Sequence, residues 1–257
     1  MLAAVVARER AEYLRERRVV LPACLLLSTS LPAEELTWPP RLPGGKQVAT
    51  DTSPELLQPT ETLREGVAIA KTAPTIDFMY YPDQTYLGHP WSVWGDGSAG
   101  AGKYYSAIGD HGAPAGNAFV YEYDAGKKQL RKLMDLDSVL NLPDGHYSPS
   151  KIHTRVDRGE DGWLYFGTHR GSTRVTIDKY HYQGDWIVRH NPDTGKSEVV
   201  AHGPVPKHCI PTGQLDPQRM IFYAGTKSGE PGSKDIHFLA YDVKNRKVLQ
   251  DVPKGPY

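Results

Sequence analysis

The chain has few cysteines, no net charge and no long hydrophobic run, and each shortage excludes a class of protein. Only two of its 257 residues are cysteines, Cys24 and Cys209, which is too few for a disulfide framework. Its 30 basic and 30 acidic residues balance, so no overall field draws nucleic acid or an acidic membrane surface to it. No apolar run is long enough to cross a bilayer. We therefore expect no nucleic-acid partner and no membrane span.

Several catalytic motifs are missing as well. The stretch 95–102 is rich in glycine, but it lacks the following helix and the Lys-Ser/Thr pair of a phosphate-binding loop. We interpret it as the inner turn of the first repeat described below. No Gly-x-Ser-x-Gly sequence is present, so a serine hydrolase of the nucleophile-elbow type is not indicated.

The N-terminus resembles an export leader. Basic residues at 15–18 precede a short apolar stretch at 19–30, and Leu31-Pro-Ala33 follows, as at a cleavage site. We expect residues 1–33 to be a leader and the protein to be secreted or periplasmic. Cleavage would leave Cys209 as the single cysteine, without an intrachain disulfide.

Three stretches of the chain repeat one pattern. Residues 103–111, 162–169 and 220–227 align without gaps, and their glycines Gly109, Gly167 and Gly225 are 58 residues apart in both intervals. Each stretch is followed by a second apolar run, a turn and a third short run with strand character. A fixed period of this size, made of strands and turns, indicates a blade-like repeat.

Each repeat reads as four strands, and a four-stranded sheet repeated radially is a β-propeller. We therefore predict an all-β fold with blades at about 85–136, 146–203 and 207–252. The proline-rich segment 34–84 carries one further strand at 75–81, which could belong to a partial blade. Three blades do not close a ring, so we expect an incomplete propeller, truncated at the C-terminal side.

Histidines recur at matching places in the repeats, in or beside the predicted inner strands at 89–94, 151–156 and 208–212. Strands near the axis of a propeller and the loops at one end of the ring bring polar side chains together. Histidine, tyrosine and arginine there could exchange protons and hold an anionic group. The candidates are His89, His111, Tyr182 and Arg189 as catalytic residues and His153, Arg155, His169, Arg170 and Tyr180 as substrate-binding residues. The alternative is that these side chains only pack and hydrogen-bond in the channel.

A metal site is a separate prediction. His208 and Cys209, with another histidine from a neighbouring inner strand, would offer nitrogen and sulfur ligands that suit zinc. No Cys-x-x-Cys or His-x-x-x-His spacing supports this prediction, and Cys209 could instead be a buried apolar residue. Zinc and calcium are the expected divalent cofactors.

The phrases Gly162-Trp-Leu-Tyr-Phe-Gly-Thr168 and Asn191-Pro-Asp-Thr-Gly-Lys196 resemble the propeller superfamily. The leader, the propeller and the histidines, with His89 and His111 separated by 22 residues, also resemble propeller-type polysaccharide lyases of the ulvan lyase and oligogalacturonate lyase type. This resemblance implies cleavage of a uronate glycan by β-elimination, with an anionic polysaccharide as partner. The alternative is a non-catalytic propeller that binds a glycan or a protein; a redox propeller ranks last.

Overall fold

The computed structural model describes residues 41–84, 93, 95–112 and 115–255, which belong to one compact unit spanning Thr37–Tyr257. The predicted leader at 1–33 and the predicted inner strand with His89 lie outside the described residues. Among the described residues, no helix has the length and apolar character needed to cross a membrane.

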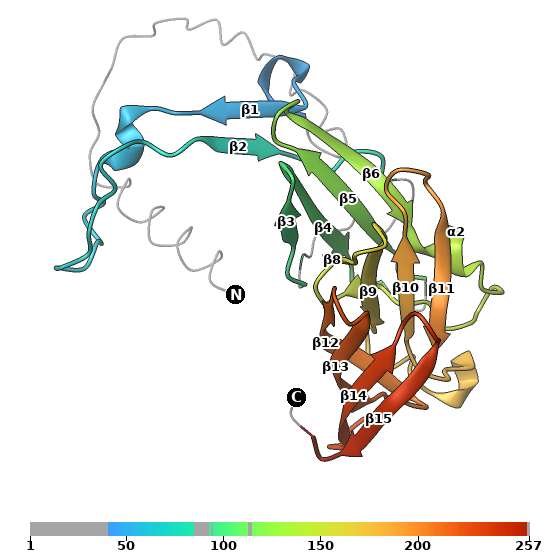
Figure 1. Ribbon diagram of the computed structural model, residues 1–257. Helices are drawn as coiled ribbons and strands as arrows, with labels where there is room; N and C mark the ends of the chain where they lie inside the picture. Colours follow the sequence, from blue (N-terminus) through green and yellow to red (C-terminus); the bar gives the residue numbers. More distant parts are fainter. Residues whose placement is uncertain (1–40, 85–92, 94, 113–114, 256–257) are drawn as a thin grey trace, which may run out of the picture. The chain divides into compact units, whose positions relative to one another are not determined.

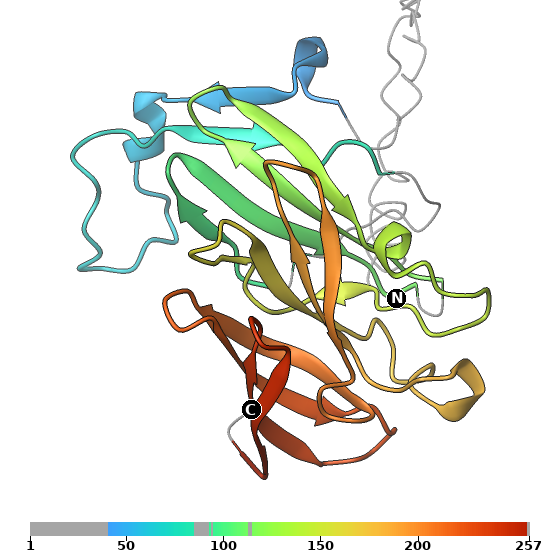
Figure 2. The ribbon, with the colours of Figure 1, turned by 45° about the vertical axis from the view of Figure 1, so that its right-hand side comes forward.

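The structure is all-β and contains sheets of four antiparallel strands (Figure 1). The first sheet consists of β3 (Ser98–Gly100), β4 (Lys103–Gly109), β5 (Ala118–Asp124) and β6 (Gln129–Asp135). The third sheet consists of β12 (His208–Asp216), β13 (Ile221–Ser228), β14 (Ile236–Asp242) and β15 (Lys247–Pro253). Figure 2 shows these last four strands side by side, in orange to red. The predicted four-stranded repeats are therefore present, whereas the described residues form no closed ring, and the propeller stays a prediction.

The middle sheet has a divided inner edge. Its long strands are β9 (Leu164–His169), β10 (Trp186–His190) and β11 (Ser197–His202). Two short strands, β7 (Lys151–Ile152) and β8 (Asp157–Arg158), both pair with β9. The sequence predicted one strand over 151–156 instead. The strand is interrupted because the amides of Arg155 and Val156 donate to Gly213 O (3.1 Å) and Asp96 O (3.3 Å) in the adjoining repeats.

The remaining elements are short. Strands β1 (Val48–Asp51) and β2 (Ile76–Met79) form a two-stranded antiparallel sheet. The helices are η1 (Pro43–Gly45), η2 (Pro54–Leu57), α2 (Leu136–Leu140) and η3 (Asp178–Tyr180). The stretch 95–102, predicted to be a turn, instead contains β3, because Ser98 and Ala99 pair with Tyr105 and Tyr104.

The middle sheet is buried on both faces. Leu164 and Phe166 of β9 pack in one apolar cluster with Tyr105 and Val120 of the first sheet. Tyr165, between them, belongs to a second cluster with side chains of the third sheet, including Phe222 and Leu239. Successive residues of a strand point to opposite faces, so the run Leu-Tyr-Phe supplies both cores. A third cluster joins the first sheet to Met79 and Tyr81 of the N-terminal segment.

The repeated glycines mark points where neighbouring sheets approach closely. A Cβ atom on Gly109 would lie 2.1 Å from the carbonyl oxygen of Ser150, and one on Gly167 would lie 2.9 Å from Cγ2 of Ile210. Both partners precede or belong to the inner strand of the next repeat. Gly225, the third glycine of the series, lines a surface groove with Tyr223 and Phe238.

We predict that Gly109→Ala destabilises the protein by about 2 kcal/mol or more, because the added methyl group must displace backbone rather than a side chain. The matched control is Gly100→Ala, since a Cβ on Gly100 meets nothing within 4 Å. Urea unfolding of both variants checks the prediction. Equal stability of the two variants would show that the backbone at Ser150 can move to accommodate a methyl group at little cost in free energy.

We also predict that Phe166→Ala costs about 3–5 kcal/mol, the usual loss for a fully buried phenylalanine. The ring of Phe166 has 0% exposure between the first and middle sheets. Trp163 is only partly buried and stacks against the Arg189 guanidinium at 4.2 Å, so Trp163→Ala should cost less. A reversed order in thermal or urea unfolding would contradict this packing.

Candidate functional site

Basic side chains from two repeats gather where β4 and β9 end. We call His111, Lys151, His153, His169 and Arg170 the basic cluster. His169 is the last residue of β9 and lies directly opposite Lys151 of β7. The imidazole rings of His153 and His169 are 4.2 Å apart between centroids. The structure thus brings together four of the residues predicted from the sequence, namely His111, His153, His169 and Arg170.

The local sequence explains this convergence. Residues opposite one another in an antiparallel pair point to the same face, and so do residues two apart on an extended chain. Lys151 and His153 therefore face the side to which His169 points. His111 follows the end of β4 and joins the group through the carbonyl oxygen of Gly171, to which its Nδ1 is hydrogen-bonded at 2.9 Å.

Burial keeps two of the histidines neutral. Burial, followed by the charges of Lys151 and His111, lowers the pKa of His153 to about 4. Burial also holds the pKa of His169 well below its usual range, with further contributions from His153, Arg170, Lys151 and His111. A low-dielectric site disfavours charged imidazole. Near neutral pH the cluster therefore contains neutral imidazoles beside cations.

Lys151 is the buried cation of the cluster. Its side chain is 6% exposed, and burial lowers its pKa to about 8, against the opposing effect of the Asp110 carboxylate. Asp110 is itself buried, and burial raises its pKa. Its Oδ1 accepts a hydrogen bond from the amide of Gly112 at 2.6 Å. Lys151 therefore carries a proton at neutral pH.

His111 is the exposed histidine of the cluster. A carbonyl oxygen can only accept, so the bond to Gly171 requires the proton on Nδ1. In the neutral ring Nε2 is then the nitrogen that can take up a proton. Arg170 is half-buried and donates from Nη1 to the carbonyl oxygen of Ser228 at 2.9 Å, so this bond fixes the guanidinium relative to the third sheet.

Two predicted tyrosines lie in the loop between β9 and β10. Tyr182 is 2% exposed and its hydroxyl is 3.4 Å from Asp185 Oδ2, whose carboxyl also accepts from Tyr147 and Thr168. Burial raises the pKa of Tyr182 far above its usual range and that of Asp185 to about 7. Tyr180 packs at the edge of the same core. Neither tyrosine joins the basic cluster.

The two other predicted arginines also lie apart from the cluster. Arg189 of β10 lies opposite Tyr165 of β9, pairs with Glu198 (Nη2–Oε2 2.6 Å) and stacks on Trp163. Arg155 pairs with Asp157 (Nε–Oδ1 3.1 Å) and lines the groove beside Gly225. Both arginines have carboxylate partners of their own, which accounts for their positions. His89, the remaining predicted catalytic residue, lies outside the described residues.

The predicted metal pair is divided by the strand. Successive residues point to opposite faces, so His208 and Cys209 diverge. The thiol of Cys209 donates to Lys227 O (3.2 Å), and burial raises its pKa to about 12. His208 instead lies beside Asp235 and His237, and the ligand atoms of these three residues all lie within 4.8 Å of one another. The described residues therefore contain a His/Asp group with the ligand types and spacing for a metal ion, and Cys209 is not part of it.

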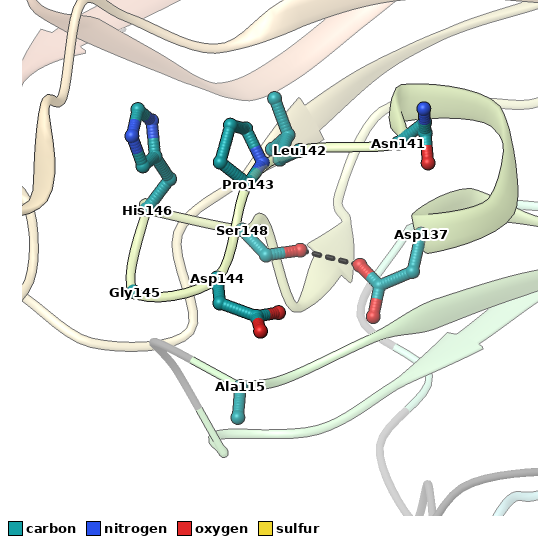
Figure 3. Close-up of a pocket in the computed structure, with 9 residues that line it drawn as sticks. All are labelled: Ala115, Asp137, Asn141, Leu142, Pro143, Asp144, Gly145, His146 and Ser148. Carbon is teal, nitrogen blue, oxygen red and sulfur yellow. Dashed lines mark hydrogen bonds between the residues drawn. The ribbon is translucent and has the colours of Figure 1, made fainter.

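A separate pocket of about 310 Å³ lies beside α2 (Figure 3). Ser148 points toward Asp137 across it and donates a hydrogen bond of 2.5 Å to Oδ1. Burial raises the pKa of Asp137, and Asp144 also lines the pocket. Because two carboxyl groups line it, this pocket is an unfavourable binding site for an anion, unlike the basic cluster.

Sequence reasoning missed Lys151, Asp110, Asp235 and His237 as site residues. Three of these omissions had a signal in the sequence. Lys151 stands two positions before His153, and Asp235 stands two positions before His237; in an extended chain such pairs share a face. Asp110 directly precedes His111, but nothing in the sequence shows that its carboxylate is buried next to Lys151.

We predict that the protein loses stability as the pH falls from about 6.5 to about 4, because the unfolded state binds protons on His153 and His169 that the folded state does not. His153→Gln should reduce this loss by about 1–3 kcal/mol, since each tenfold change in proton affinity corresponds to about 1.4 kcal/mol. Urea unfolding across this pH range measures it. The same substitution at the exposed His181 is the control, and an unchanged pH profile in His153→Gln would contradict the assignment.

Comparisons with known proteins find no family model that matches the chain. A probable endonuclease 4 of Metamycoplasma arthritidis (strain 158L3-1) is 26% identical over 73 residues, which are 28% of this chain and 26% of that protein. An oligogalacturonate lyase in complex with manganese is similar over 61% of this chain and 42% of its own, with 8% identity and a TM-score of 0.38. The GH74 xyloglucanase from Xanthomonas campestris is similar over 57% and 18%, with 16% identity and a TM-score of 0.31. The chain thus spans less than half the length of each of these proteins.

Proposed function

We propose that the protein is an exported, carbohydrate-active protein that binds a uronate-containing polysaccharide at the basic cluster and cleaves it by β-elimination. The observation that carries the proposal is the basic cluster itself. It combines two cations, Lys151 and Arg170, with neutral imidazoles at one end of two adjoining sheets. Binding without cleavage, of a glycan or a protein, is the alternative that the experiment below separates.

Cations are needed because β-elimination removes the proton on the sugar carbon next to the carboxylate. Neutralising the carboxylate makes this C5 proton more acidic. Arg170 can hold a carboxylate with its guanidinium, and the positive charge of Lys151 acts over a short distance in a buried setting. The carboxyls of Asp110, which acts on Lys151, and of Asp185, which acts on Arg170, are both buried, and burial raises the pKa of each.

His111 is the proposed base. It is exposed, and the bond from Nδ1–H to Gly171 places the basic lone pair of the neutral ring on Nε2, the atom that would take the C5 proton. The electron pair of the broken C5–H bond forms the C4=C5 double bond, and the bond from C4 to the linking oxygen breaks. The oxygen leaves with a proton, for which the protonated His111 is a source. The products are an unsaturated uronate end and a new hydroxyl end.

Tyr182 is not assigned this role, although the sequence suggested it. Its hydroxyl is buried and lies next to the Asp185 carboxyl, and both features favour the protonated phenol. We propose instead that Tyr182 and Asp185 support the long loop 170–185, which carries Arg170 at its start.

A divalent cation, with zinc and calcium as candidates, remains a proposal for this protein. Its ligands would come from outside the basic cluster, from the group formed by His208, Asp235 and His237. The elimination described above does not pass through it. Export likewise remains a proposal that rests on the leader-like residues 1–33, and it agrees with a polymeric substrate found outside the cell.

The experiment is to mix the purified full chain with a panel of uronate polysaccharides and follow the ultraviolet absorbance of the unsaturated product. We predict a rising signal on at least one polymer. His111→Ala should reduce the rate by about 100-fold or more, as expected for loss of a general base, while polymer binding by calorimetry and thermal unfolding stay close to those of the wild type.

The control is His202→Gln, which changes a histidine that stacks on Trp186 outside the cluster; it should retain the wild-type rate. Arg170→Ala should weaken both binding and cleavage. No absorbance change on any polymer, together with binding that Arg170→Ala abolishes, would replace the lyase by the binding alternative. Absence of both binding and cleavage would overturn the proposal as a whole.

A further inference from the structure

One end of the third sheet carries a group of ligand-type side chains that the proposed lyase chemistry does not use. His208 begins β12, His237 is the second residue of β14, and Asp235 lies in the loop just before β14. The Nε2 atoms of His208 and His237 each lie 3.4 Å from an oxygen of the Asp235 carboxylate, His208 from Oδ2 and His237 from Oδ1. The two rings meet edge to face with 4.6 Å between centroids.

These separations suit a small tetrahedral ion. Two ligand atoms about 2.0–2.1 Å from zinc at a tetrahedral angle lie about 3.4 Å from each other. Each histidine nitrogen lies at this separation from one of the two oxygens of the Asp235 carboxylate, and one ligand atom from each of the three residues lies within 4.8 Å of the others. Two imidazoles and one carboxylate are also a common ligand set of zinc sites that keep an open position.

Each histidine is oriented by a hydrogen bond on its other nitrogen. His208 Nδ1 is 3.0 Å from Thr226 Oγ1, and His237 Nδ1 is 2.5 Å from Asp251 Oδ1. Metal-binding histidines regularly use their second nitrogen in this way, because the bond fixes the ring and directs the lone pair at the metal. The supporting residues come from β13 and β15, so all four strands of the sheet contribute to the arrangement.

The backbone holds the carboxylate in place. The carbonyl oxygen of Asp235 accepts a hydrogen bond from the amide of Ser228 at 2.9 Å, and its amide donates to Ser233 Oγ at 3.2 Å. The side chains of His208 and His237 are 6% and 15% exposed, whereas that of Asp235 is 53% exposed. The two nitrogens therefore lie inward and the carboxylate closes the group on the solvent side.

We propose that His208, Asp235 and His237 form a zinc-binding site with one coordination position that opens to solvent beside Asp235. Imidazole nitrogens favour zinc over calcium, which takes six to eight oxygen ligands. Calcium, the other cofactor expected from the sequence, does not suit these ligands. The site is independent of the lyase proposal, because none of its residues belongs to the basic cluster.

The test uses the full chain, stripped of metal with a chelator and titrated with zinc chloride in calorimetry, with elemental analysis of the dialysed complex. We predict one zinc per chain and no heat on titration with calcium chloride. His237→Ala should weaken binding at least 100-fold. Asp251→Asn should weaken it by about 10–100-fold, the usual effect of losing the partner of a metal-bound histidine.

Three further measurements keep the test decisive. Cys209→Ala, next to His208 but on the opposite face, should bind zinc like the wild type. Asp235→Asn changes an exposed side chain and covers the case in which His237→Ala does not fold. Cobalt in place of zinc should give the intense visible absorption of a tetrahedral ion. Zinc binding unaffected by both Asp235→Asn and His237→Ala, or no binding by the wild type, would overturn the proposal, whatever the result with polysaccharides.

Discussion

The close approach of neighbouring sheets at their inner edges is the constraint on which the rest of the structure depends. At Gly109 the backbone of one repeat touches the segment that leads into the next, with no room for a Cβ atom. This contact sets the position of Ser150, and the chain then runs directly into Lys151 and His153. Backbone packing therefore determines where the residues of the basic cluster lie, independently of the interactions among their side chains.

The same packing explains why the cluster has unusual electrostatics. The middle sheet is covered on both faces, so the histidines at its end are removed from water and stay neutral. Charged groups in such a setting interact more strongly than they would at a surface. The protein therefore keeps two imidazoles neutral beside cations, and it does so at pH values below about 6.5, where histidines of an exposed patch would take up protons.

Much of the fold could be predicted from the sequence, because the repeated strand pattern carries its own register. The three aligned runs that contain Gly109, Gly167 and Gly225 already showed the strand pattern and its fixed spacing of 58 residues. The candidate site was predicted in part. Histidines at equivalent positions indicated His111, His153 and His169, whereas Arg155 and Arg189 were expected there only by residue type. The partner of Arg155, Asp157, is two residues away, and that of Arg189, Glu198, lies across the hairpin of β10 and β11. Ion pairs of this kind leave no periodic signal. The separation of His208 from Cys209 follows from strand alternation and could have been foreseen.

The bond between His237 and Asp251 joins β14 to β15, the outermost strand, all of whose residues are exposed. An outer strand with little burial is expected to open more often than the rest of a sheet. An interaction that fixes the His237 ring also fixes the Asp251 carboxylate bonded to it. It therefore stabilises β15, the strand that carries Asp251. Such coupling acts equally in both directions. Opening of β15 therefore frees the His237 ring, and fixing the ring makes opening of β15 less frequent. The rate of amide hydrogen exchange along β15 therefore reports on what binds the His237 ring at Nε2, the nitrogen that does not face Asp251.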